Sequence, residues 1–102
     1  MQKDLYVNSE KLCYEIVNDL IQEIEMGKYN DCGIFVKKII EVPLYFEYDF
    51  NYLQELLRNY DIKLSSDEVN APNANKEIYA CYQITFDKEY ILNNAEKYKS
   101  TR

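Results

Sequence analysis

Hydrophobic residues recur every three or four positions in the first quarter of the chain, which is the period of an amphipathic helix. This spacing predicts a helix over residues 9–26, with Asn8 or Ser9 as its N-terminal cap and Gly27 as the residue that ends it. The predicted buried stripe consists of Leu12, Cys13, Ile16, Val17, Leu20, Ile21 and Ile24.

Segment 34–42 is compatible with either a helix or a strand. As a helix, the segment would place its apolar residues on one side and its charged residues on the other. The apolar side would carry Phe35, Val36, Ile39, Ile40 and Val42, and the charged side Lys37, Lys38 and Glu41. The many β-branched residues favour a strand, but Lys38 interrupts the alternation that a half-buried strand should show. We predict a helix that ends before Pro43 and keep a strand as the alternative.

The second half of the chain predicts two more helices and two strands. Asp49 is a suitable cap for a helix over 50–60, and the alternation of residues 62–65 predicts a short strand. Residues 66–76 are polar and predict a loop, and the regular alternation of 77–86 predicts the longest strand. Asp87 can cap a last helix that carries Tyr90, Ile91, Ala95 and Tyr98, with a frayed tail from about residue 97.

These elements predict an α+β fold: three N-terminal helices, a two-stranded antiparallel hairpin and a C-terminal helix, which is the order of a winged helix. Residues 24–29, Ile-Glu-Met-Gly-Lys-Tyr, resemble the end of the first helix in some bacterial winged-helix regulators. If 34–42 is instead a strand, the alternative is a small antiparallel sheet covered by helices on one face.

Composition narrows the chemistry more than the fold. The 102 residues form a single domain over 1–102 with a net charge of −6, which repels phosphate and disfavours direct binding of nucleic acid. Histidine is absent, and with it the usual general base and zinc ligand. The three cysteines have no CxxC spacing, and neither a secretory signal nor a membrane span is visible. We therefore expect a cytoplasmic protein that is not an enzyme and has no cofactor or metal.

Two segments are candidates for contact with a partner. An acidic stripe on the first helix contains Glu15, Asp19, Gln22 and Glu23. Five of the eight residues in 45–52 are aromatic, and the candidate contacts there are Tyr45, Glu47, Tyr48, Asp49 and Tyr52. Alternatively, the stripe is only a solvated face, and the aromatic segment only fills and covers the core.

The charge pattern predicts a non-enzymatic acidic inhibitor that occupies the basic, nucleic-acid-binding surface of a partner protein. Small acidic anti-defence proteins of phages and mobile elements, including anti-CRISPR and anti-restriction proteins, work in this way. Frequent Ile, Lys, Asn and Tyr indicate an AT-rich bacterial or mobile-element gene. One alternative is a winged-helix-like DNA-binding module that uses Lys37, Lys38 and Arg58. The other is an assembly subunit, with a homodimer formed through the first helix.

Overall fold

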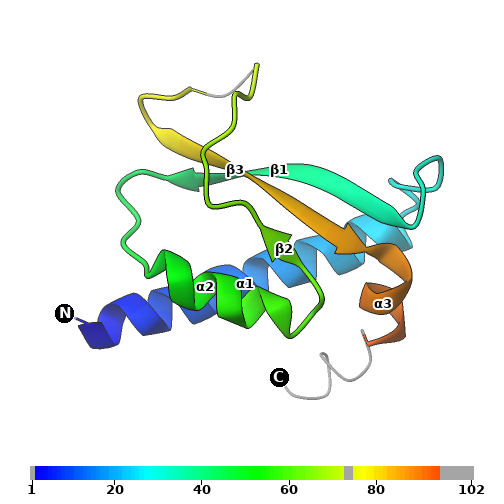
Figure 1. The fold of residues 1–102 in the computed structure, drawn as a ribbon, viewed down its shortest axis with the longest axis horizontal. Coiled ribbons are helices and arrows are strands. Elements are labelled where there is room, and N and C mark those ends of the chain that lie inside the picture. Colours follow the sequence, from blue (N-terminus) through cyan, green and yellow to red (C-terminus); the bar gives the residue numbers. More distant parts are fainter. Residues whose placement is uncertain (1, 73–74, 95–102) are drawn as a thin grey trace.

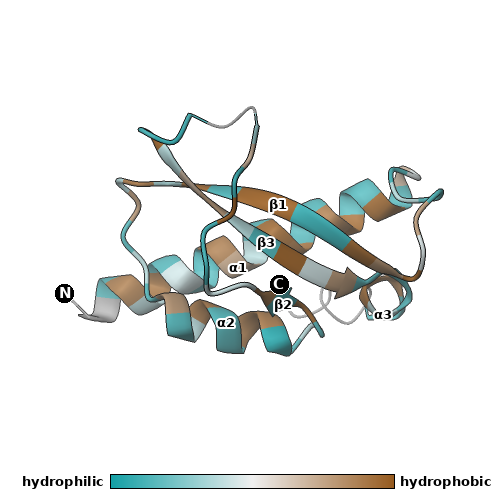
Figure 2. Cartoon of the chain, turned by 45° about the horizontal axis from the view of Figure 1, so that its top comes forward, coloured by the Kyte–Doolittle hydropathy of each residue, from teal (hydrophilic) through white to brown (hydrophobic). Residues whose placement is uncertain are grey.

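The computed structural model describes residues 2–72 and 75–94, and it confirms the α+β class (Figure 1). Three antiparallel strands form one sheet in the order β1-β3-β2, and the helices lie on one side of it. The elements in chain order are α1 (Gln2–Glu25), β1 (Phe35–Pro43), α2 (Phe50–Arg58), β2 (Lys63–Leu64), β3 (Tyr79–Asp87) and α3 (Lys88–Asn93). Hydrophobic segments recur along α1 and along the strands (Figure 2).

The prediction of a helix over 34–42 is wrong, because this segment forms β1 and pairs with β3 along its whole length. Lys38 points toward α1, where its ammonium meets Glu23, while Phe35 and Ile39 are exposed on the other face. Each face therefore mixes apolar and charged residues, which hides the alternation. The winged-helix-like order of three helices is wrong as well, and the alternative sheet is confirmed.

The N-terminus of α1 also differs from the prediction. The helix begins at Gln2, so neither Asn8 nor Ser9 is its cap. Ser9 is fully buried, and its hydroxyl donates to the Leu5 carbonyl at 2.8 Å and accepts from the Asp49 amide at 2.9 Å. A serine that looks like a cap in the sequence therefore joins α1 to the start of α2.

We expect Ser9→Ala to destabilise the protein by about 1–2 kcal/mol, because the Asp49 amide would lose its acceptor at a buried position. Urea unfolding measures the change. Ser66→Ala is a matched control at an exposed position and should stay within about 0.5 kcal/mol of the parent. Equal effects of the two substitutions would contradict the structural role of Ser9.

Three predicted helix ends are confirmed. Gly27 ends α1 with a φ of 82°, a conformation that favours glycine, and its amide and that of Lys28 bond to carbonyls in the last turn. Asp49 caps α2 by accepting from the Tyr52 amide at 3.0 Å. Asp87 caps α3 in the same way. The predicted contribution of Ala95 and Tyr98 and the tail from about 97 lie outside the described residues.

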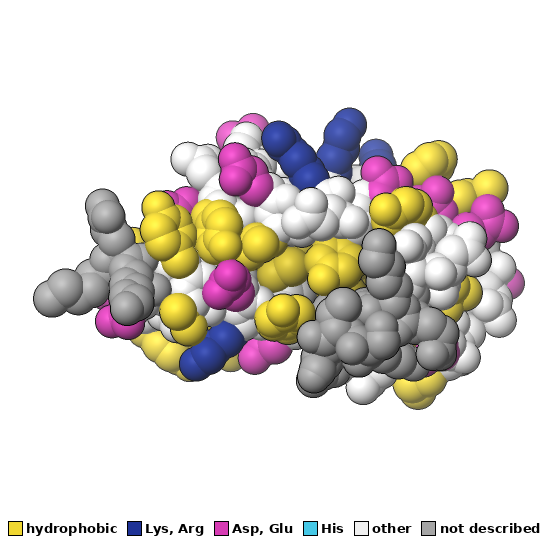
Figure 3. All heavy atoms as spheres, turned by 90° about the horizontal axis from the view of Figure 1, so that it is seen from below, with side chains coloured by type: hydrophobic (Ala, Val, Ile, Leu, Met, Phe, Trp, Pro, Cys, Tyr) yellow, Lys and Arg dark blue, Asp and Glu magenta, His cyan; other side chains and the backbone are white. Residues whose placement is uncertain are grey.

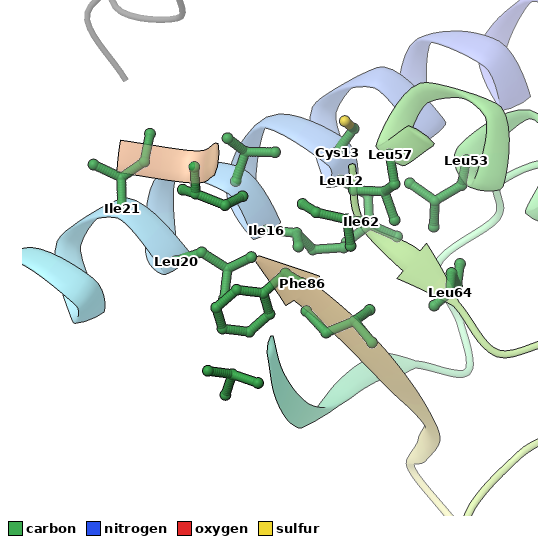
Figure 4. Packing of buried hydrophobic residues seen from close by; sticks show 14 of the residues in the cluster. Leu12, Cys13, Ile16, Leu20, Ile21, Leu53, Leu57, Ile62, Leu64 and Phe86 are labelled. Carbon is green, nitrogen blue, oxygen red and sulfur yellow. The ribbon is translucent and has the colours of Figure 1, made fainter. Parts of the chain in front are cut away.

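The core lies between α1 and the inner face of the sheet (Figure 4). Phe86 points from β3 toward Leu20 of α1, and leucines of α2 close one end of the cluster. Cys13 is buried as predicted, and burial together with Glu10 raises the pKa of its thiol to about 12. Along the described part of the chain, no helix is long and apolar enough to cross a membrane.

Candidate functional site

A groove of about 300 Å³ runs between α1 and β1. We call it the α1–β1 groove. Glu15 and Asp19 lie on the helix wall, and Glu41 borders the groove at the strand edge, with its side chain on the outer face of the sheet like that of Ile39. Its lining residues are Leu12, Glu15, Ile16, Asp19, Lys38, Ile39, Ile40, Glu41 and Val42.

The structure divides the predicted acidic stripe. Glu15, Asp19 and Gln22 are exposed, and the first two line the groove because positions four apart share one side of a helix. Glu23 is half-buried and is not part of the groove lining. The helical spacing was therefore enough to place two of the three carboxylates on one accessible surface.

Glu23 instead forms a cluster with three donors. Its Oε1 accepts from the Tyr29 hydroxyl at 2.5 Å and from the Lys38 ammonium at 2.8 Å, and its Oε2 accepts from Lys28 at 3.0 Å. Burial would raise the pKa of Glu23, but the hydrogen bonds from Lys38, Tyr29 and Lys28 outweigh it and lower the pKa to about 2. Because Glu23 engages Lys38, the cation on the groove wall already has a partner carboxylate.

Glu41 is a groove residue that the sequence analysis did not propose. A helix over 34–42 would have grouped it with Lys37 and Lys38 on a mixed, solvated side. As part of β1 it borders the groove at the edge of the strand, with its side chain on the same outer face as Lys37 and Ile39. The β-branched residues of 34–42, which favour a strand, were the feature of the sequence that could have placed Glu41 beside the groove.

The aromatic segment 45–52 is partly surface and partly core. Tyr45 is 81% exposed, shortly after the strand residues that line the groove. Glu47 is exposed, and its backbone carbonyl accepts from the Asn8 side chain at 2.8 Å. Asp49 is occupied as the cap of α2. Of these three, Tyr45 and Glu47 present side chains that a partner can reach.

Tyr48 and Tyr52 are half-buried and serve the fold. Tyr48 packs against the core, where burial, followed by interactions with Tyr82 and Glu68, raises the pKa of its hydroxyl. The Tyr52 ring meets Tyr6 edge-on at 4.9 Å, and its hydroxyl donates to Glu10 at 3.1 Å. These two tyrosines join α2 and the segment before it to the rest of the molecule.

The cations of the DNA-binding alternative do not form one cluster. Lys38 faces α1, whereas Lys37 lies on the outer face of the sheet, in register with Thr85 and, beyond it, Lys63. Arg58 and Lys63 line a separate open hollow of about 570 Å³ together with the exposed Phe35. Lys63 thus joins Arg58 in this hollow, although the Asp61 side chain also lines it and offsets part of their charge.

The side of the molecule below the helices in Figure 1 has a different character. Hydrophobic side chains form a band across it, interrupted by single acidic ones, and Lys and Arg side chains gather at one edge (Figure 3). On α1, the large hydrophobic side chains left exposed are Tyr6, Val7 and Tyr14.

Within residues 2–72 and 75–94, no three His, Cys, Asp or Glu side chains gather closely enough to hold a metal ion. Comparisons of the chain with protein-family models, with curated proteins and with solved structures find no match. The function is therefore inferred from the geometry and charge of the surface itself.

Proposed function

We propose that this protein is a non-enzymatic inhibitor whose acidic α1–β1 groove binds the basic, nucleic-acid-binding surface of a partner protein, as anti-defence proteins of phages and mobile elements do. The observation that carries the proposal is that Glu15 and Asp19 line one groove, which Glu41 borders from the edge of β1. Carboxylates one helical turn apart offer neighbouring acceptors to Arg and Lys, in the place of phosphate groups. Tyr45, exposed near one end of β1, adds aromatic contact area.

The net charge of −6 supports fast association with a basic surface. Since Lys38 is already bonded to Glu23, it offsets the groove carboxylates only weakly. Association should slow as salt is added, because ions screen charges over about 10 Å at 0.1 M.

The test is capture of a partner from a nuclease-treated host lysate, followed by affinity measurement with the purified partner. We expect wild type to capture a basic, nucleic-acid-binding protein and Glu15→Lys/Asp19→Lys to bind it at least about 30-fold more weakly, because close charge pairs at interfaces contribute strongly. The control Asp67→Lys/Glu77→Lys makes the same change in net charge at exposed loop positions outside the groove lining. It should bind within about threefold of wild type, since rim charges contribute little.

Equal affinity of wild type and Glu15→Lys/Asp19→Lys would contradict the proposal. The proposal would also be contradicted if wild type is retained on heparin at low salt and the variant Arg58→Glu/Lys63→Glu is not. That result would favour the second candidate, direct binding of nucleic acid, which the shared hollow of Arg58 and Lys63 supports.

A further inference from the structure

Strand β1 is an edge of the sheet, since the strand order is β1-β3-β2. Beyond its two ends, the Ile34 carbonyl accepts from Lys88 at 3.0 Å and the Leu44 amide donates to Ile78 at 2.7 Å. Both bonds join even-numbered residues to the residues that flank β3, in the same register as the β1–β3 pairs, and hydrogen-bonded pairs alternate in an antiparallel ladder. The odd-numbered residues of β1 therefore direct their backbone N–H and C=O groups away from β3, and the described part of the chain offers no other strand to pair with them.

This edge is long and accessible. It spans nine residues, and the outward-facing side chains on it are exposed, including Phe35 at 69% and Ile39 at 40%. Soluble proteins usually protect such edges, because a row of unpaired backbone groups is a template for another strand. Pro43, which has no N–H, marks the end of the usable edge.

The α1–β1 groove follows this edge. Five consecutive residues, 38–42, line it, although successive side chains of a strand point to opposite faces. Side chains from both faces of β1 can border one groove only if the groove runs along the edge of the strand, beside its backbone. Helix α1 forms the other wall, so a strand added to β1 would lie in the groove above Glu15 and Asp19.

We infer that an extended basic segment of the partner adds to β1 as a fourth strand, with alternate Lys or Arg side chains paired to Glu15 and Asp19. This inference rests on the proposed function and specifies how the groove is occupied. The two carboxylates are four residues apart, or about 6 Å along the helix. Alternate residues of a strand are about 6.7 Å apart. A segment of the pattern basic-X-basic therefore matches the spacing of the helix wall.

A second copy of the chain fits the edge less well. Antiparallel pairing of two β1 strands centred on Ile39 would place Lys37 opposite Glu41, which is favourable. The same pairing would bring the Glu15 and Asp19 carboxylates of both copies to one side of the joined sheet. Like charges would then face each other across the junction, whereas a basic segment neutralises them.

The experiment uses a display library of random 12-residue peptides, selected on the intact protein and followed by affinity measurements on the enriched sequences. We expect enriched peptides to carry Lys or Arg at alternate positions. Ile39→Pro removes a backbone donor that faces the groove and leaves the pairing with β3 in place, so it should weaken binding about tenfold or more. Circular dichroism and a thermal melt check that this variant is folded.

N-methylation of the peptide is an independent measurement that does not depend on the folding of Ile39→Pro. Methyl groups on the alternate amides that face β1 should abolish binding, whereas methyl groups on the intervening amides should leave it within about threefold. Sensitivity to one set of amides and not to the other supports strand addition. Equal responses to the two sets overturn it.

The remaining outcomes separate the two proposals. Basic peptides that bind Ile39→Pro normally but fail to bind Glu15→Lys/Asp19→Lys would overturn strand addition and leave the proposed function standing. Basic peptides that bind Glu15→Lys/Asp19→Lys normally would overturn both. Failure to enrich any peptide would overturn strand addition, as would a dimer in light scattering that Ile39→Pro dissociates, because a second copy would then occupy the edge.

Discussion

Phe86→Ala is expected to destabilise the protein by about 3–5 kcal/mol, because it leaves a large cavity at the centre of the core. The side chain is 1% exposed and points from β3 toward Leu20 of α1 (Figure 4). Its ring also meets that of Tyr29 edge-on, with centroids 5.5 Å apart. Helix, sheet and the turn after α1 therefore all lose contact with this one residue.

Urea unfolding at pH 7 measures this loss, and Phe35→Ala is the matched control. Phe35 belongs to the same sheet but is 69% exposed, so its truncation should change stability by less than about 0.5 kcal/mol. Domains of this size are stable by about 5–15 kcal/mol, so Phe86→Ala should leave a part of the molecules unfolded on mild heating. Similar losses from Phe86→Ala and Phe35→Ala would contradict the assignment of the inner and outer faces of the sheet.

Glu23→Gln is expected to cost about 2 kcal/mol at pH 7, because a neutral amide has only one acceptor oxygen for the three donors Lys38, Tyr29 and Lys28. The folded-state pKa of Glu23 is about 2, below the ordinary value of 4.5. A lowered pKa contributes stability that is complete above the unfolded-state pKa and is lost as the pH falls through the folded-state value. The difference between wild type and Glu23→Gln should therefore shrink between pH 4.5 and pH 2.

Free energies of unfolding at pH 7, at pH 4.5 and near pH 2 measure this dependence. Glu15→Gln is the control, because Glu15 is exposed on the same helix, and it should stay within about 0.5 kcal/mol of wild type at pH 7. A difference for Glu23→Gln that is constant across this range would contradict the role of the carboxylate charge. High salt should reduce the difference as well, since the cluster is partly exposed.

Local patterns predicted most elements correctly because their causes are local. Residues 77–86 alternate since one face of β3 is covered by the core, and Asp49 and Asp87 bond to amides only two or three residues away. The end of α1 at Gly27 has a similar origin, in a backbone conformation that favours glycine. The residues that determine these helix ends all lie within a few positions of one another in the chain.

The wrong predictions for 34–42 and for the cap of the first helix both involve polar groups whose partners lie far away in the chain. Lys38 faces inward because Glu23 accepts its charge, and no pattern within 34–42 contains that carboxylate. Ser9 is a buried residue inside α1, where its hydroxyl accepts from the Asp49 amide, 40 residues away. In both cases a polar group that looks solvated or capping in the sequence is satisfied by a contact across the fold.

The candidate site shows the same division. Helical spacing alone predicted that Glu15 and Asp19 share a surface. The net charge of −6 alone indicated a preference for basic partners. Three features depend on how α1 packs against the sheet: the place of Glu41 at the border of the groove, the free edge of β1 and the partial burial of Glu23 in an ion-pair cluster. Which residues are accessible together is a property of packed elements, because contacts between positions far apart in the chain determine which side chains stay exposed.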